Sequence, residues 1–358
     1  MSTALVTDST AYLPADLLAG LDVRVVPLHV VVGGREHAEG VDIDAAGVAA
    51  ALRSFIPVST SRPAPAAFLS AYEAAAAGGA DAVVSVHISA EMSSTIGGAE
   101  LAAAQSPLPV TVVDSRALGM AMGYAVLAGA RLAAGGATAR EVAEAVRATC
   151  AGATVVFYVD TLEYLRRGGR IGKAGALVGS ALSIKPILGL RDGHIVPLER
   201  VRTSSRAIAR LEDLAVEAVE AAGRRATRGT RSRGHGSGGD GSGGDGSGDD
   251  GSRGDGSRGD GSPGDGSRGE GWLGVDVAVQ HLDSSDRAER LAERLRARIG
   301  DRGAVRVVEL GAVVGAHVGP GTLAVAVVPR VAPRVVPPDV GGSPTGTAGD
   351  TGDAGTAR

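Results

Sequence analysis

Hydroxyl side chains follow three of the expected strands of this 358-residue chain. The relevant residues are Asp8 and Ser9 in TDST, Thr60, Ser61 and Arg62 in STSRPAP, and Ser93 and Ser94 in SAEMSST. Each stretch precedes an expected helix, whose N-terminus offers unpaired N–H groups and about half a positive charge. Together they predict a site for a small anionic group. Serine and threonine are also the preferred N-cap residues, so any one stretch could be only a cap.

A single histidine, His317, stands in the glycine-rich stretch VGAHVGPG, from Val314 to Gly321. This stretch separates two expected strands, VRVVEL and TLAVAVV, and we expect it to be a loop. In one interpretation the histidine is incidental to a tight turn. In the other, the glycines allow the loop to direct the imidazole toward a ligand.

Several other chemistries fit the sequence less well. TDSTAYLP has no glycine fingerprint for a dinucleotide, and there is no Walker loop. The seven histidines are scattered without paired spacing, so we expect neither a metal site nor a cofactor. A serine hydrolase using Ser93, His317 and Asp8 stays an alternative, although Glu91 and Thr95 stand where the glycines of a nucleophile elbow would be.

The elements that must position these residues change character along the chain. In the first half, valine-rich stretches such as DAVVSVHI and PVTVVD alternate with alanine-rich helical segments, a pattern typical of βαβ units and a parallel sheet. Hairpins appear after Cys150, with Asp192-Gly193 as an expected turn. We therefore predict an α/β fold with an N-terminal α/β domain over residues 1–150 and a C-terminal α+β domain over residues 151–330.

Two segments contain too few apolar side chains to form a core. Residues 224–271 consist mainly of glycine, serine, aspartate and arginine, and the tail over residues 331–358 is similar. Such segments cannot bury enough surface to offset the entropy of ordering, so we predict disorder in both. The preceding helix is expected to end at Gly223.

Composition excludes several classes of protein. The formal net charge of −4 gives no basic field for nucleic acid. Cys150 is the sole cysteine, so no intramolecular disulfide is expected. The N-terminus does not look like a signal peptide, and no apolar run approaches roughly 18 residues. We expect a cytoplasmic monomer with no integral membrane contact.

Several motifs, in this order, resemble those of the DegV family of bacterial proteins. They are VTDSTAYLP, TSRPAPAAFLSAYE, ISAEMSST, VVDSRALGMAMG, TLEYLRRGGRIG, SIKPIL, VRTSSRAI and GAHVGPG. The resemblance covers residues 1 to about 222 and 275 to about 329. It implies a long-chain fatty acid held between two α/β domains, no turnover by the protein itself and, in some bacteria, presentation of the carboxylate to a separate fatty acid kinase.

The resemblance also assigns roles to residues. Thr60 matches the threonine of the family's Thr-Ser-x-Pro loop, Ser93 the second serine of its serine-rich loop, and His317 the histidine of its closing loop. All three are expected to hydrogen-bond the carboxylate, with Ser61 and Ser94 beside them. Arg202 resembles an arginine linked to the kinase reaction or docking, and we expect Arg170 to support the same step. We expect Asp8, Ser9 and Arg62 nearby. Two departures are Arg62, where the family often has glutamine, and SSTI, where it often has Ser-Gly-Thr-Tyr.

Overall fold

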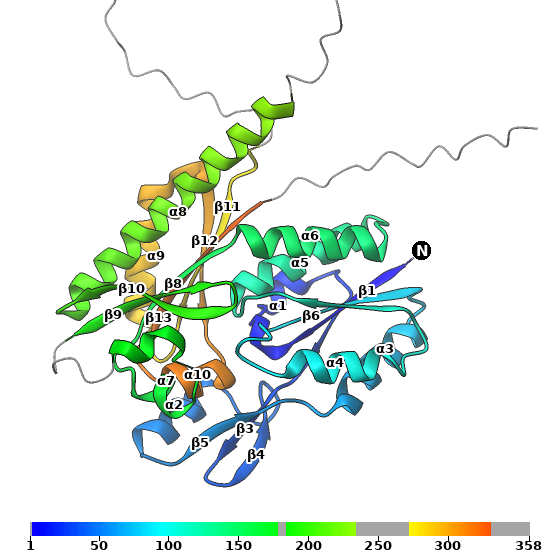
Figure 1. Ribbon diagram of the computed structural model, residues 1–358, viewed down its shortest axis with the longest axis horizontal. Coiled ribbons are helices and arrows are strands. Elements are labelled where there is room, and N and C mark those ends of the chain that lie inside the picture. The colour runs from blue at the N-terminus through cyan, green and yellow to red at the C-terminus, as the bar shows by residue number, and fades with distance from the viewer. Residues whose placement is uncertain (1, 178–183, 234–271, 331–358) are drawn as a thin grey trace, which may run out of the picture.

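The computed structural model describes residues 2–177, 184–233 and 272–330 (Figure 1). Within them, the first sheet has the strand order β2-β1-β6-β7, and all of its neighbours are parallel. Its strands are β1 (Thr3–Asp8), β2 (Val23–Val26), β6 (Ala82–His87) and β7 (Val110–Asp114). The valine-rich stretches therefore form the parallel sheet that the sequence predicted.

The second sheet is mixed, with the order β10-β9-β8-β13-β11-β12. Its strands are β8 (Thr154–Tyr158), β9 (Lys185–Arg191), β10 (His194–Val201), β11 (Val275–His281), β12 (Gly303–Glu309) and β13 (Leu323–Pro329). Only β11 and β12 are parallel neighbours among these strands. Asp192 and Gly193 have φ of 51° and 81°, which confirms the predicted turn between β9 and β10. The predicted fold class, a parallel N-terminal sheet followed by an α+β region, is confirmed, and the domain boundary near residue 150 stays a prediction.

Helices cover both sheets and also lie between them (Figure 1). They are α3 (Pro65–Ala77) and α4 (Thr95–Ala103) on the first sheet, α5 (Met120–Ala134) and α6 (Ala139–Gly152) between the sheets, and α8 (Ser204–Arg233) and α9 (Ser285–Ile299) on the second. Every residue from Met120 to Leu127 is buried, as expected for a helix that is apolar on all sides. Its core therefore includes both Leu5 of the first sheet and Ala326 of the second.

A third, antiparallel sheet has the order β4-β3-β5. Its strands are β3 (His29–Val32), β4 (Arg35–Ala38) and β5 (Val58–Ser61), and it packs with α2 (Ala45–Arg53) and α10 (Ala312–Val318). The shorter elements are η1 (Ser9–Ala11), α1 (Ala15–Leu18), α7 (Glu163–Arg167), η2 (Gly172–Leu177) and η3 (Gly300–Arg302).

Residues 23–32 form two strands in different sheets, with Pro27 between them, because proline interrupts a strand. Two details of the sequence prediction were wrong. Thr60 lies in an antiparallel strand and not beyond an end of the parallel sheet. The expected loop around His317 is the helix α10.

The helix α8 continues past Gly223 to Arg233, so the predicted insert begins with ten helical residues. Arginine and alanine favour a helix, and Arg224 lies 3.6 Å from Glu220, one turn earlier. The rest of the predicted insert, 234–271, and the predicted tail, 331–358, lie outside the described residues.

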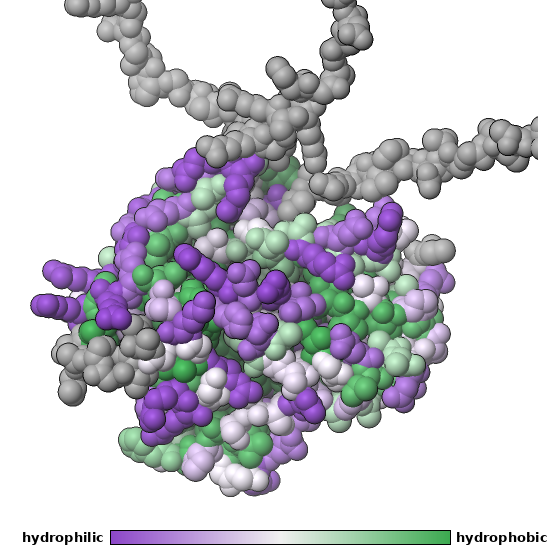
Figure 2. All heavy atoms as spheres, viewed as in Figure 1, coloured by the Kyte–Doolittle hydropathy of each residue, from purple (hydrophilic) through white to green (hydrophobic). Residues whose placement is uncertain are grey.

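Figure 2 shows hydrophilic side chains along the upper part of α8 and at the outer ends of β9 and β10, mixed with smaller apolar areas. Among the helices that the structure describes, none is long and apolar enough to cross a membrane.

Candidate functional site

A cavity of about 220 Å³ brings the predicted carboxylate-binding residues together. We call it the head-group pocket. Its polar lining consists of Thr60, Ser61, Arg62, Ser93, Ser94, Arg170 and His317. Its apolar lining consists of Leu28, Ile88, Met92, Leu118, Leu165, Ile195, Val313, Val314 and Val318. The pocket therefore combines hydroxyl, imidazole and guanidinium side chains with an aliphatic wall.

His317 lies in the last turn of α10 and contacts Thr60 of β5. The Nε2 atom of His317 is 2.8 Å from the Oγ1 atom of Thr60. Its Nδ1 atom is buried and has no hydrogen-bond partner among the described residues. The ring lies so close to Gly168 that a Cβ atom there would overlap it. A glycine after α7 is therefore needed for this position of the imidazole.

Burial lowers the pKa of His317 to about 4, with a smaller contribution from the positive charge of Arg170. The imidazole is therefore neutral at pH 7. A neutral imidazole still has one N–H group, so it can donate one hydrogen bond to a carboxylate oxygen.

The hydroxyls of the serine-rich loop are not used to cap α4. Ser94 occupies the N-cap position, but its side chain makes no capping hydrogen bond and instead accepts one from the Nη1 atom of Arg62 at 2.8 Å. Ser93 Oγ lies 2.8 Å from Thr95 Oγ1. These side chains thus face the pocket, and the capping interpretation does not apply to them.

Ser61 is oriented differently from its neighbour Thr60. Its hydroxyl donates to the Oε1 atom of Glu36 at 2.9 Å, and the same oxygen lies 3.1 Å from His29 Nδ1. Ser61 lines the pocket, but its hydroxyl proton is directed to β4.

The two arginines with a predicted role in the kinase step lie in different places. Arg170 lines the head-group pocket, and its guanidinium donates to the carbonyl of Met92 at 3.2 Å and of Gly168 at 2.8 Å. Arg202 is exposed between β10 and α8 and does not line the head-group pocket.

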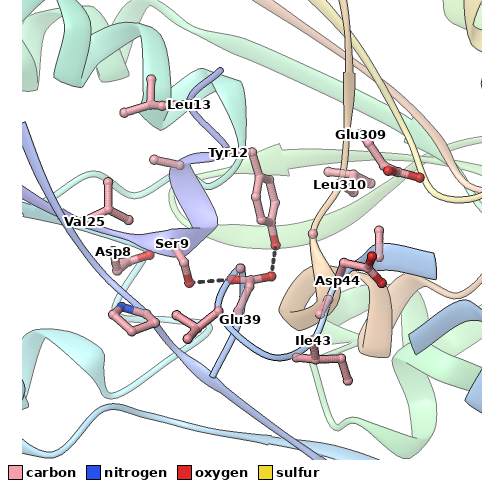
Figure 3. A pocket seen from close by; sticks show the side chains of 17 residues that line it. Asp8, Ser9, Tyr12, Leu13, Val25, Glu39, Ile43, Asp44, Glu309 and Leu310 are labelled. Atoms are coloured by element: carbon pink, nitrogen blue, oxygen red, sulfur yellow. Dashed lines mark hydrogen bonds between the residues drawn. The ribbon is translucent and has the colours of Figure 1, made fainter. Parts of the chain in front are cut away.

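Asp8 and Ser9 line a second cavity of about 420 Å³ (Figure 3). We call it the acidic cavity, because Asp8, Glu39, Asp44 and Glu309 all line it. Asp8 and Ser9, which we expected near the carboxylate site, line the acidic cavity and not the head-group pocket. The turn of η1 directs these residues toward Glu39 and His87 instead.

The structure does not assemble the alternative hydrolase triad. Ser93 pairs with Thr95, His317 pairs with Thr60, and the Oδ2 atom of Asp8 lies 3.1 Å from the Nδ1 atom of His87. A different Asp-His-Ser chain does form, because the Nε2 atom of His87 is 2.7 Å from the Oγ atom of Ser85. Asp8, Ser85 and His87 are all 0% exposed, so a substrate cannot reach this chain. Alternate residues of one strand share a face, so the Ser85–His87 pair was detectable in the sequence.

Glu39 and Tyr12 were not identified from the sequence. The Oε1 atom of Glu39 accepts a hydrogen bond from the Tyr12 hydroxyl at 3.3 Å (Figure 3). The same atom accepts one from Val313 N at 2.7 Å. Burial raises the pKa of Glu39, while hydrogen bonds from Ser9 and Val313 oppose the increase. No local pattern marks this contact, since 274 residues separate Glu39 from Val313.

Among the described residues, no group of three or more His, Cys, Asp or Glu side chains could hold a metal ion.

Known proteins are similar to this chain in sequence. The family model described as "Uncharacterised protein, DegV family" matches residues 2–233 and 267–330. A DegV domain-containing protein of Streptomyces coelicolor is 43% identical over 327 residues, which are 91% of this chain and 98% of the relative. One from Deinococcus radiodurans is 41% identical over 215 residues, or 60% of this chain and 76% of the relative.

Two solved structures are similar to the whole described fold. One is a fatty-acid-binding DegV family protein from Thermus thermophilus, with a TM-score of 0.70 and 29% identity over 92% of this chain and 100% of that chain. The other is DegV, a fatty acid binding protein from Bacillus subtilis, with a TM-score of 0.72 and 25% identity over 92% of this chain and 100% of that one. The chain therefore belongs to the DegV family.

Proposed function

We propose that this protein binds a long-chain fatty acid in the head-group pocket, with the carboxylate held by Thr60, Ser93 and His317. One observation carries the proposal: hydroxyls, a neutral imidazole and two arginines meet in one cavity whose remaining lining is aliphatic. Such a lining suits a ligand with one anionic end and an alkyl body. The two similar structures, both of fatty-acid-binding proteins, support the same ligand.

The carboxylate would be held by directional hydrogen bonds in addition to charge. Thr60 and Ser93 each have a hydroxyl, and the neutral His317 has one N–H group. His317 Nε2 pairs with Thr60 Oγ1, so a bound carboxylate would replace one partner of this pair. Arg62 and Arg170 add positive charge at the exposed side of the pocket. Alkyl burial contributes about 0.8 kcal/mol per CH₂, so chain length dominates affinity and the polar group selects the acid.

The ligand would lie between the two proposed domains. Residues of the pocket come from positions 28–118 and from positions 165–318, on both sides of the proposed boundary near residue 150. A ligand held there contacts both halves, so binding should also stabilise their arrangement.

We further propose that the protein has no turnover of its own and presents the carboxylate to a separate fatty acid kinase. The support is that Arg62, Ser94 and Arg170 line the pocket and are exposed, so that the carboxylate would lie close to the surface. Arg202, exposed at the start of α8, is proposed as a contact with that partner.

The proposal is tested by comparing a C16 fatty acid with the C16 alcohol. A hydrogen bond to a charged group contributes roughly 1.5–3 kcal/mol, so Thr60→Ala and Ser93→Ala should each weaken binding of the acid by about tenfold to hundredfold. Binding of the alcohol should change much less. Arg202→Gln, outside the head-group pocket, is the matched control and should bind both ligands like wild type.

Native mass spectrometry of the purified protein gives an independent measurement. A co-purified mass matching a C16 or C18 acid would support the proposal. A protein that binds neither ligand, or one that cleaves a chromogenic ester and loses this activity in Ser93→Ala, would contradict it.

A further inference from the structure

The N-terminus of α10 is capped by residues from distant parts of the chain. Its own N-cap residue is Gly311, which has no side chain to accept a hydrogen bond. The N–H of Val313 donates to Glu39 Oε1 at 2.7 Å, and the N–H of Val314 donates to the Tyr12 hydroxyl at 3.1 Å. The first N–H groups of a helix have no partner within it, so these two bonds supply what the helix lacks.

The residues held in this way are also a wall of the head-group pocket. Val313 and Val314 line the pocket, and His317 follows them on the same helix, about one turn later. A shift of the N-terminus of α10 would therefore move both the aliphatic wall and the imidazole. Such a helix transmits a displacement because its backbone hydrogen bonds keep it rigid.

Ser9 connects the same group to the opposite wall. Its hydroxyl donates to Glu39 Oε2 at 2.5 Å (Figure 3). It also accepts from Leu28 N at 3.0 Å. Leu28 lines the head-group pocket. Ser9, Tyr12 and Glu39, which we call the Glu39 cluster, thus fix Leu28 relative to α10.

Two backbone features show that the cluster is closely fitted. A Cβ atom at Gly311 would overlap both the Glu39 carboxylate and the Tyr12 ring, so only glycine allows this approach. Tyr12 itself has a φ of 48°, in the left-handed region that residues with a side chain rarely adopt. Such a conformation persists only where surrounding contacts hold it, and it is frequent at functional sites.

We propose that Glu39 and Tyr12 are positioning residues, which hold α10 so that His317 reaches the carboxylate of a bound fatty acid. The inference rests on the proposed function of the head-group pocket. Residues that line the acidic cavity would thus position residues of the head-group pocket. The Glu39 carboxylate acts on the head-group pocket through the backbone N–H of Val313, at the start of α10.

The test compares four variants in binding of the C16 acid and the C16 alcohol. Glu39→Ala removes the acceptor of Val313 N and should weaken binding of the acid by about tenfold, the lower end expected for a hydrogen bond to a charged group. Binding of the alcohol should fall less, because the alcohol loses only contacts with the aliphatic wall of α10, whereas the acid also loses the hydrogen bond between the imidazole and its carboxylate. Tyr12→Phe, which removes the acceptor of Val314 N but keeps the ring, should have a smaller effect of the same kind.

The conservative variant Glu39→Gln should restore binding to within about threefold of wild type, because its amide oxygen can accept from Val313 N and its NH₂ group can donate to Ser9 Oγ. Glu309→Gln is the matched control. Glu309 lines the same cavity but is exposed at the end of β12, so its substitution should leave the acid-to-alcohol ratio unchanged. Equal losses for acid and alcohol in Glu39→Ala would overturn the inference.

A second measurement does not require lipid. The ring nitrogens of His317 can be followed by NMR in the unliganded protein labelled with ¹⁵N-histidine. We expect Glu39→Ala, but not Glu39→Gln or Glu309→Gln, to shift the His317 signals as its contact with Thr60 changes. Unchanged signals in Glu39→Ala would contradict the positioning role. If wild type fails to bind the acid, the proposed function is wrong, whereas the NMR result still decides the link between Glu39 and His317.

Discussion

The head-group pocket and the acidic cavity both use α10 as a wall, yet they suit different ligands. The acidic cavity is the larger, about 420 Å³ against about 220 Å³, and Asp8, Glu39 and Glu309 line it. The smaller pocket contains two arginines instead. A fatty acid carries a negative charge, and like charges disfavour one another in a partly buried site. The sign of the charge, and not the volume, therefore favours the smaller pocket.

The two cavities also differ in their expected response to pH. Burial lowers the pKa of His317 and raises that of Glu39, so in both cases the neutral form is favoured. A lowered histidine pKa contributes stability above the unfolded value, and this contribution is lost as the pH falls through the folded value. A raised glutamate pKa contributes stability at low pH, and this contribution is lost as the pH rises through the folded value. Acid should therefore destabilise the folded protein at His317, in the head-group pocket, and remove the cost of the buried charge at Glu39, in the acidic cavity.

The largest expected effect is on the pH dependence of stability in His317→Gln. Between about pH 6.5 and about pH 4, the unfolded chain binds a proton at this position and the folded protein does not. The wild type should therefore lose up to about 1.4 kcal/mol of stability per pH unit relative to the variant. Urea unfolding at a series of pH values measures the difference. His194→Gln, at an exposed histidine, is the control, and a difference between wild type and His317→Gln that does not vary with pH would contradict the expectation.

Gly168→Ala should damage the head-group pocket without a charge change. The added methyl group would overlap the His317 ring and displace it from Thr60. Binding of the C16 acid should weaken by about tenfold to hundredfold, as for loss of one hydrogen bond to a charged group. Gly175→Ala is the control, because a methyl group there meets Ile171 at an ordinary distance of 3.7 Å. Unchanged affinity in Gly168→Ala would mean that the imidazole does not have to lie against Gly168.

Glu39→Gln tests the effect of a buried charge in the acidic cavity on stability. Burial raises the pKa of Glu39, so ionising this carboxyl group costs more in the folded protein than in the unfolded chain, whereas glutamine carries no charge. The variant should be more stable by about 1 kcal/mol or less, roughly 2–4 °C in Tm, and this gain should disappear in acid. Thermal unfolding at pH 7 and pH 4 measures it, with Glu309→Gln as the exposed control. A variant that is less stable at both pH values would show that ionisation of Glu39 is not a cost to the fold.

The smallest effect is expected for Arg62→Gln, which introduces the residue that the family often has here. Arg62 is exposed and contacts Ser94, and exposed charges contribute at most about 1 kcal/mol, or up to about fivefold in affinity. Affinity for the C16 acid should fall by that amount at low salt, and the difference should shrink at high salt. Arg202→Gln should show neither change. A salt-independent loss in Arg62→Gln would indicate a packing effect and not a charge effect.

The sequence predicted the parts of the structure that depend on local pattern. The valine-rich stretches around Leu5 and Val84 formed the parallel sheet, and Asp192-Gly193 formed the expected turn. The meeting of Thr60, Ser93 and His317 at one pocket was expected from the resemblance to the DegV family, in which each residue belongs to a separate motif.

What the sequence did not predict depends on contacts between distant residues. The stretch around His317 contains glycine and valine, which are weak helix formers, and its N–H groups are satisfied by Glu39 and Tyr12. Only folding brings these residues to α10, so the local sequence pattern predicted a loop here and not a helix. That Asp8 lines the acidic cavity depends in the same way on a distant contact, because its partner His87 lies on β6.

The buried chain of Asp8, His87 and Ser85 has a consequence for recognising enzymes by shape. It continues to Tyr72, whose hydroxyl is 2.9 Å from Ser85 Oγ, and it serves to join β1, β6 and α3. A template search based on side-chain spacing alone would rank it as a serine-hydrolase centre. A serine-reactive fluorophosphonate cannot enter it while the protein stays folded, so solvent access has to be examined before spacing when catalytic triads are assigned in this family.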